Sequence, residues 1–129
     1  MFFEKPQKRL KYGTWELGVS QDGIPQAMQY TNRILVNSDN YEEIIPSSIY
    51  AAATDSSAFN CIPHTVTPEF GEDMQVGYTC RVESDGSKKI VLVLSGKYDE
   101  MNFSIDGKIE YFPERVAHDI SATGRFVEP

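Results

Sequence analysis

The sequence predicts a mainly β protein: an antiparallel β-sandwich or barrel with one or two short helices and extended termini. Apolar and polar residues alternate with a period of two through several short segments, as they do in strands with one buried face. Turn residues recur at short intervals, and the chain contains seven prolines and nine glycines. Its 129 residues, 40% of them hydrophobic, suffice for one domain with a core of its own.

Three strands are expected in the first half of the chain, over residues 10–20, 33–36 and 59–67. The alternation is clearest in the first strand, where Trp15, Leu17 and Val19 share one face. The segment GVSQDGIP then turns the chain. Pro63 is expected to interrupt the third strand, because proline cannot donate to a strand ladder.

Two short helices are expected in the same half, over residues 26–30 and 48–54. Pro25 stands near the start of the first, where a proline is tolerated. Asp39 and Glu42 have the spacing of a capping box. A helix that begins there is expected to stop early, because Pro46 follows.

The second half predicts a meander of four strands within residues 73–112. In the first, QVGYTCRVE, every second residue is apolar, and SDGSK then forms a turn. Residues 89–94 are apolar on both faces, which predicts a central strand that is covered on both sides. Residues 96–100 turn the chain again.

A hairpin is expected at the end of this meander, with a three-residue loop from Ile105 to Gly107. This loop would pair Phe103 with Ile109, and Met101 with Tyr111, so that apolar residues face each other.

After this hairpin the sequence is compatible with more than one secondary structure. Pro113 is expected to end the last strand of the meander or to mark a sheet edge. Residues 114–120 fit one helical turn or a final strand, and residues 121–129 fit an extended arm or a short edge strand. The chain therefore divides into an N-terminal arm (1–11), a β-rich domain (12–120) and a C-terminal tail (121–129).

Charge is distributed unevenly around a net value of −7. The arm carries +3, residues 12–80 carry −8, and residues 81–129 carry −2. No Lys or Arg occurs from Ile34 to Cys80. Such acidity makes a nucleic-acid partner improbable and favours a protein partner.

Two cysteines, Cys61 and Cys80, are too few for a disulfide framework, and a reducing compartment would keep them as buried thiols. Whether they meet stays open at this stage. No apolar stretch approaches the ~18 residues of a membrane span. The start, MFFEKPQKRL, lacks the apolar region of a signal peptide. The expected location is the cytoplasm, or a particle that incorporates the protein.

Three groups of residues are candidates for metal binding or catalysis. His64 with Glu69, Glu72 and Asp73 would suit a divalent metal, but a solvated acidic loop fits the spacing better. Cys61 and His64 would form a nucleophile and base only if Pro63 makes a turn.

The third group is His118 with Asp119 and Glu114. If this segment were helical, Glu114 and His118 would be neighbours able to exchange protons, although a surface ion pair is the commoner outcome. The chain also lacks phosphate-binding loops, a nucleophile elbow and zinc motifs. We therefore expect no catalytic residue, metal or cofactor, and no small-molecule substrate is identified.

Two roles are open for four aromatic residues as well. Trp15 with Tyr12, and Tyr41 with Tyr50, would suit stacking on a sugar or a small ring, but core packing is the commoner role.

The function expected from these observations is non-enzymatic protein interaction or structural assembly, as in a phage or virion accessory protein whose arms contact neighbouring subunits. One alternative is an acidic inhibitor of the immunity or anti-defence type, and the other is a small-ligand-binding barrel. The expected interaction residues combine the basic, aromatic arm with acidic positions: Phe2, Phe3, Lys5, Lys8, Arg9, Lys11, Asp39, Glu42, Glu43, Glu69, Glu72 and Asp73.

Overall fold

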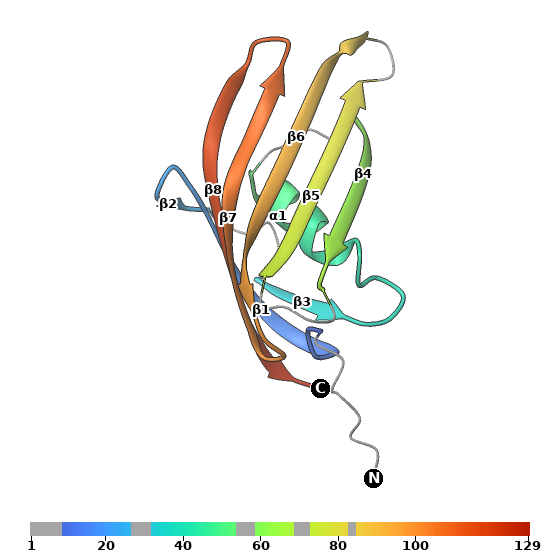
Figure 1. Ribbon diagram of the computed structural model, residues 1–129, viewed down its shortest axis with the longest axis vertical. Helices are drawn as coiled ribbons and strands as arrows, with labels where there is room; N and C mark the ends of the chain where they lie inside the picture. Colours follow the sequence, from blue (N-terminus) through green and yellow to red (C-terminus); the bar gives the residue numbers. More distant parts are fainter. Residues whose placement is uncertain (1–8, 27–31, 54–58, 69–72, 83–84) are drawn as a thin grey trace.

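The computed structural model describes residues 9–26, 32–53, 59–68, 73–82 and 85–129, and these form one antiparallel sheet with a helix against one face (Figure 1). The strands are β1 (Gly13–Gln21), β2 (Ile24–Pro25), β3 (Arg33–Val36), β4 (Phe59–Val66), β5 (Asp73–Val82), β6 (Asp85–Tyr98), β7 (Asn102–Phe112) and β8 (Val116–Glu128); the helix is α1 (Ile44–Ala53). The strand order is β2-β1-β8-β7-β6-β5-β4, with β3 also beside β1. The mainly β class is confirmed, but the sheet does not close into a sandwich or barrel.

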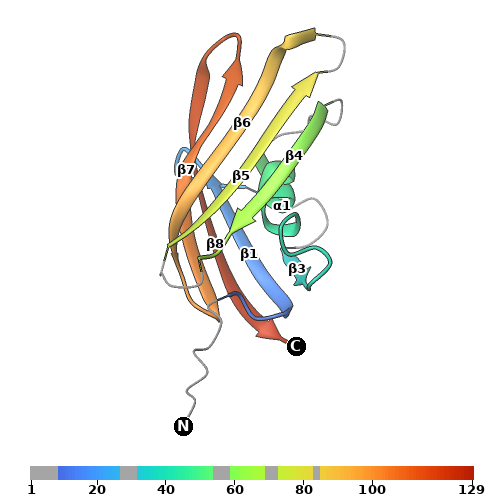
Figure 2. The same ribbon diagram turned by 45° about the vertical axis from the view of Figure 1, so that its right-hand side comes forward.

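Helix α1 covers the inner face of the sheet (Figure 2). It contacts β4 and β5 near one end of the strand order and β1 and β3 near the other. Ile45 and Ile49 are fully buried in the core that these strands share. The helix thus occupies the space across which the two ends of the sheet would have to pair.

Pro46 does not stop this helix, contrary to expectation. It is the third residue of α1, in the first turn, where backbone N–H groups have no partner within the helix. The helix therefore begins at Ile44 and includes residues 48–53, which the sequence did predict as helical. Among the described residues, no helix combines the length and apolarity that crossing a bilayer requires.

The predicted strands of the first half are confirmed, but the expected interruption at Pro63 is wrong, because β4 runs through this residue. Strand β4 ends the strand order, and such an edge position tolerates a proline because one side of the strand needs no ladder partner. The helix expected at 26–30 falls almost entirely outside the described residues.

The central position of β6 is confirmed, since it pairs with β5 and β7. Its expected cover on both faces is wrong. Leu92 and Leu94 on the inner face are fully buried, whereas Val93 on the outer face is 45% exposed. A continuous apolar run thus marks a strand whose outer side chains remain accessible.

The hairpin expected at Ile105–Gly107 is also wrong, because β7 is continuous through these residues. Phe103 pairs with Tyr98 and Gly124, and Ile109 pairs with Leu92 and His118. Gly107 is needed for a different reason: a Cβ there would overlap the backbone carbonyl of Val93 on β6. The glycine permits close approach of two strands, which a local sequence pattern does not distinguish from a turn.

The C-terminal segment is neither an arm nor an edge strand. Strand β7 ends at Phe112, directly before Pro113, as predicted. Strand β8 then runs from Val116 to Glu128 between β7 and β1. Its pairing with β1 brings Phe126 opposite Trp15, which is fully buried and donates its indole N–H to Lys11 O at 2.8 Å. The tail is therefore part of the sheet interior.

Candidate functional site

The basic arm contacts its own chain where the structure describes it. The Arg9 guanidinium lies 4.1 Å from the centre of the Tyr12 ring and donates to the Tyr12 hydroxyl at 2.9 Å. The Lys11 ammonium lies 5.0 Å from the centre of the Phe126 ring. Phe2, Phe3, Lys5 and Lys8 lie outside the described residues. The described bases of the arm are therefore held by cation–π contacts within the molecule.

The predicted acidic positions that the structure describes are not gathered into one site. Asp39, Glu42 and Glu43 are exposed in the segment before α1. Asp73 forms an ion pair with Lys97 at 2.8 Å, with both side chains 71% exposed, which contributes little to stability. Glu69 and Glu72 lie outside the described residues. In the part that the structure describes, no three His, Cys, Asp or Glu side chains form a group that could hold a metal ion.

Cys61 and Cys80 form a disulfide, so the expectation of two thiols is wrong. They are register partners on β4 and β5, with Cα atoms 4.0 Å apart. This short separation is typical of the closely spaced pairs of an antiparallel ladder. The bond removes the thiol that a Cys61–His64 nucleophile would need. As expected for an extended strand, His64 points to the opposite face, where its ring covers Gly77.

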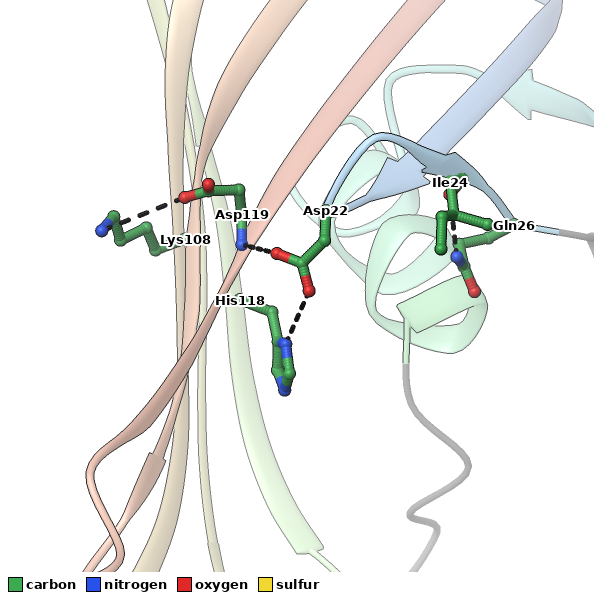
Figure 3. A network of polar contacts seen from close by, with 6 residues as sticks. All are labelled: Asp22, Ile24, Gln26, Lys108, His118 and Asp119. Carbon is green, nitrogen blue, oxygen red and sulfur yellow. Dashed lines mark hydrogen bonds and ion pairs between the residues drawn. The ribbon is translucent and has the colours of Figure 1, made fainter.

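His118 belongs to a polar network that joins distant parts of the chain (Figure 3). It lies on β8, so the predicted neighbour Glu114 is not beside it on a helix. Its Nδ1 lies 2.8 Å from Asp22 Oδ2, and Asp22 Oδ1 accepts the Asp119 N–H at 2.9 Å. Asp22 N–H also donates to Asp119 O at 2.8 Å, which extends the β1–β8 ladder by one residue.

The Asp22 carboxylate lies where the His118 ring and the Asp119 N–H converge. The Asp119 N–H and the His118 ring hold the pKa of Asp22 below its ordinary value of 3.8. Asp22 reaches this position because Asp22 and Gly23 form the tight turn between β1 and β2, with φ values of 51° and 82°. A histidine–aspartate pair can act as a general base when a nucleophile lies beside it. The aromatic ring described beside His118 is that of Tyr111, with centroids 6.2 Å apart. The contacts of Asp22 with His118 and Asp119 therefore attach the β1–β2 hairpin to β8.

One half of the outer face of the sheet carries a surface without formal charge. We call it the uncharged face, and it comprises Ile62, His64, Val66, Gln75, Gly77, Thr79, Val91, Val93 and Ser95. These residues are adjacent by register on β4, β5 and β6, and none is Asp, Glu, Lys or Arg. Ile62 is 73% exposed, and Val66 and Val93 are nearly half exposed.

Charged residues border the uncharged face on three sides. Arg81 and Lys89 lie opposite each other beyond one end, and the Asp73–Lys97 pair lies beyond the other. Along the third side, Glu110, Lys108 and Asp106 on β7 lie opposite the three β6 residues of the uncharged face. A surface with exposed apolar side chains and a charged rim is typical of protein–protein interfaces.

The other half of the outer face contains a shallow groove along β1 and β8. Two adjoining hollows of about 450 and 370 Å³ share Leu17, Gly18, Asn32 and Thr123. We call their combined surface the polar groove; its uncharged hydrogen-bonding side chains are Ser20, Gln26, Asn32, Asn102, Ser121 and Thr123. Neither surface was predicted from the sequence, because each depends on the register between strands distant along the chain.

The aromatic residues considered for stacking have mixed positions. Trp15 and Tyr50 are buried, as the commoner reading predicted, and Tyr50 stacks on Tyr78 with centroids 4.4 Å apart. Tyr12 and Tyr41 pack edge to face against each other, and both are partly buried beside the core. Comparison of the chain with protein-family models, curated proteins and solved structures found no match.

Proposed function

We propose that this protein is a non-enzymatic assembly module that associates with a second copy of itself through the uncharged face. The observation that carries the proposal is the exposure of three apolar side chains on this face, Ile62, Val66 and Val93, with charged residues on three sides of it. Exposed valine and isoleucine side chains gain free energy when a partner removes them from water.

Charge favours this face for contact between identical chains. Each copy carries −7, so two copies repel at long range. Contact is least opposed where neither copy presents a carboxylate, and the uncharged face meets that condition. In a two-fold arrangement the same face serves both copies, so that each apolar side chain contributes twice.

Salt separates this function from inhibition of a basic partner. Added salt screens repulsion between like-charged copies and should strengthen self-association. The same salt would weaken an acidic inhibitor bound to a basic site. The two functions therefore respond to ionic strength in opposite directions.

The Cys61–Cys80 bond supports an oxidising compartment for the module rather than the expected cytoplasm. Disulfides persist in oxidising surroundings and are rare where thiols are kept reduced. The bond also joins β4 to β5, the two strands that supply six residues of the uncharged face. A fixed register between these strands keeps that face in one arrangement.

Two matched variants test the proposal. Ile62→Glu and Ser104→Glu each add one negative charge at an exposed outer-face position, but Ser104 lies on β7 outside the uncharged face. Light scattering on a sizing column should show an oligomer for the wild type and for Ser104→Glu. Ile62→Glu should weaken the association at least tenfold, because it places two like charges in the interface. A monomeric wild type, or equal effects of both variants, would reject this interface.

A further inference from the structure

We propose that the polar groove on β1 and β8 is a binding site for an uncharged, polyhydroxylated ligand, specifically a saccharide unit. This goes beyond the proposed assembly function, because the groove lies on the opposite half of the outer face from the uncharged face. Its hollows of about 450 and 370 Å³ fall within the range of small-molecule sites.

Small residues create the depth of the groove. Gly18 faces outward on β1 opposite Thr123, and Ser20 lies opposite Ser121. A Cβ added to Gly18 would stand 3.2 Å from Thr123 Oγ1, so the glycine keeps the floor low. Larger side chains rise beyond this floor, where Glu16 and Arg125 form an ion pair at 3.2 Å.

Gln26 and Asn32 supply one wall. Gln26 N–H donates to Val19 O at 2.8 Å, and Asn32 O accepts the Leu17 N–H at 2.7 Å. These bonds hold both amide side chains beside the middle of β1. The Gln26 amide nitrogen donates to Ile24 O at 2.9 Å, which leaves the Gln26 side-chain oxygen as an acceptor.

The chemistry of the lining selects the class of ligand. Hydroxyl and amide groups both donate and accept hydrogen bonds, as sugar hydroxyls do. Leu17, Val19 and Phe103 also line the hollows, but their side chains are buried on the inner face and offer little to an apolar ligand. Arg125 is neutralised by Glu16, which disfavours an anion. An uncharged polar ligand is what these groups together fit.

The strength of binding should be modest. The Phe103 ring lies over Gly124 on the inner side of the sheet and does not offer its face to the groove. A single sugar unit would therefore bind mainly through hydrogen bonds, whose net contribution is small because water competes for the same groups. A Kd in the millimolar range is expected, on the order of −4 kcal/mol.

The test is a titration of the full-length protein followed by amide NMR signals. The probes are D-glucose, D-galactose, N-acetyl-D-glucosamine and diacetylchitobiose, each raised to about 50 mM, well above a millimolar Kd. At least one should shift the signals of residues 16–20 and 121–125 in a saturable way. No saturable shift with any of the four would overturn the proposal.

Variants locate the site. Gly18→Val fills the floor at an outward strand position and should weaken binding at least tenfold. Ala117→Val adds the same side chain at an exposed position of β8 outside the groove, and it should leave binding unchanged. Thr123→Val removes a hydroxyl while keeping its shape and should weaken binding severalfold, which keeps the test valid if Gly18→Val fails to fold.

Two further outcomes count against a saccharide. Shifts that survive both Gly18→Val and Thr123→Val would place the sugar elsewhere. Saturable shifts at the groove with trialanine, but with none of the sugars, would identify a peptide backbone as the ligand class. Loss of self-association in Ile62→Glu should leave sugar binding intact, so that failure of the assembly function and failure of this site are distinguishable.

Discussion

The two halves of the outer face differ although they belong to one continuous sheet. On β4 to β6 the uncharged face carries exposed apolar side chains and no formal charge. On β1 and β8 the outer positions carry glycine, serine and threonine beside an ion pair. Most inner positions of both halves are apolar and buried, and Thr65 on β4 is a buried polar exception. Burial therefore accounts for most inner residues, whereas it does not explain the contrast on the outer face, which we attribute to the two contacts proposed above.

The largest loss of stability is expected from a substitution in the core beneath the polar groove. Trp15 is fully buried, its ring lies 5.8 Å from Phe103 and 6.0 Å from Phe126, and its indole N–H is hydrogen bonded. Trp15→Ala should lower the free energy of unfolding by about 3–5 kcal/mol, as large-to-small changes in cores do. Urea unfolding followed by circular dichroism measures this. A loss below about 1 kcal/mol would contradict the packing of β1 against β7 and β8.

The next largest loss of stability is expected from removing the disulfide in the half that carries the uncharged face. The Cys61–Cys80 bond closes a loop with a sequence separation of 19, and replacing both cysteines by alanine should cost about 3 kcal/mol. Self-association should weaken as well, because the bond no longer fixes β4 against β5. Sugar binding at the polar groove should persist at temperatures where the variant remains folded. An unchanged unfolding midpoint would show that the bond does not stabilise this edge.

A smaller effect is expected at the centre of the uncharged face. A Cβ at Gly77 would overlap the His64 ring, which can swing away because it is the far end of an exposed side chain. Gly77→Ala should change the free energy of unfolding by less than about 1 kcal/mol yet weaken self-association by altering the contact surface. His64→Ala in the same chain removes the overlap and serves as the control. A Gly77→Ala protein that associates like the wild type would place the contact elsewhere.

The smallest effect depends on pH and concerns the β1–β2 hairpin. Because the pKa of Asp22 is lowered in the folded protein, its charged form contributes stability above the ordinary value of 3.8. That contribution is lost as the pH falls through the lower folded value. Asp22→Asn should therefore be less stable than the wild type at pH 6, and the difference should shrink towards pH 2. A difference in urea midpoint that is constant over this range would exclude the charge as its cause.

The sequence predicted the inner face better than the outer one. Period-two alternation identified Trp15, Leu17 and Val19 as one buried side, because burial of every second residue is a local property of a strand. The turn predicted at Ile105–Gly107 is wrong, because a glycine that permits strands to approach leaves the same local pattern as a turn glycine. The pairs Cys61–Cys80 and Asp22–His118 depend on register, which residue types alone do not determine. The 96-residue separation of Asp22 and His118 left no local signal to find.

The central claim is that copies of this chain meet through a surface without formal charge. Sedimentation of the full-length protein at salt concentrations from about 50 to about 500 mM tests it most directly, because this range shortens the screening length severalfold. The account predicts an oligomer whose dissociation constant falls as salt rises. A protein that stays monomeric throughout, or an oligomer that dissociates on adding salt, would contradict it.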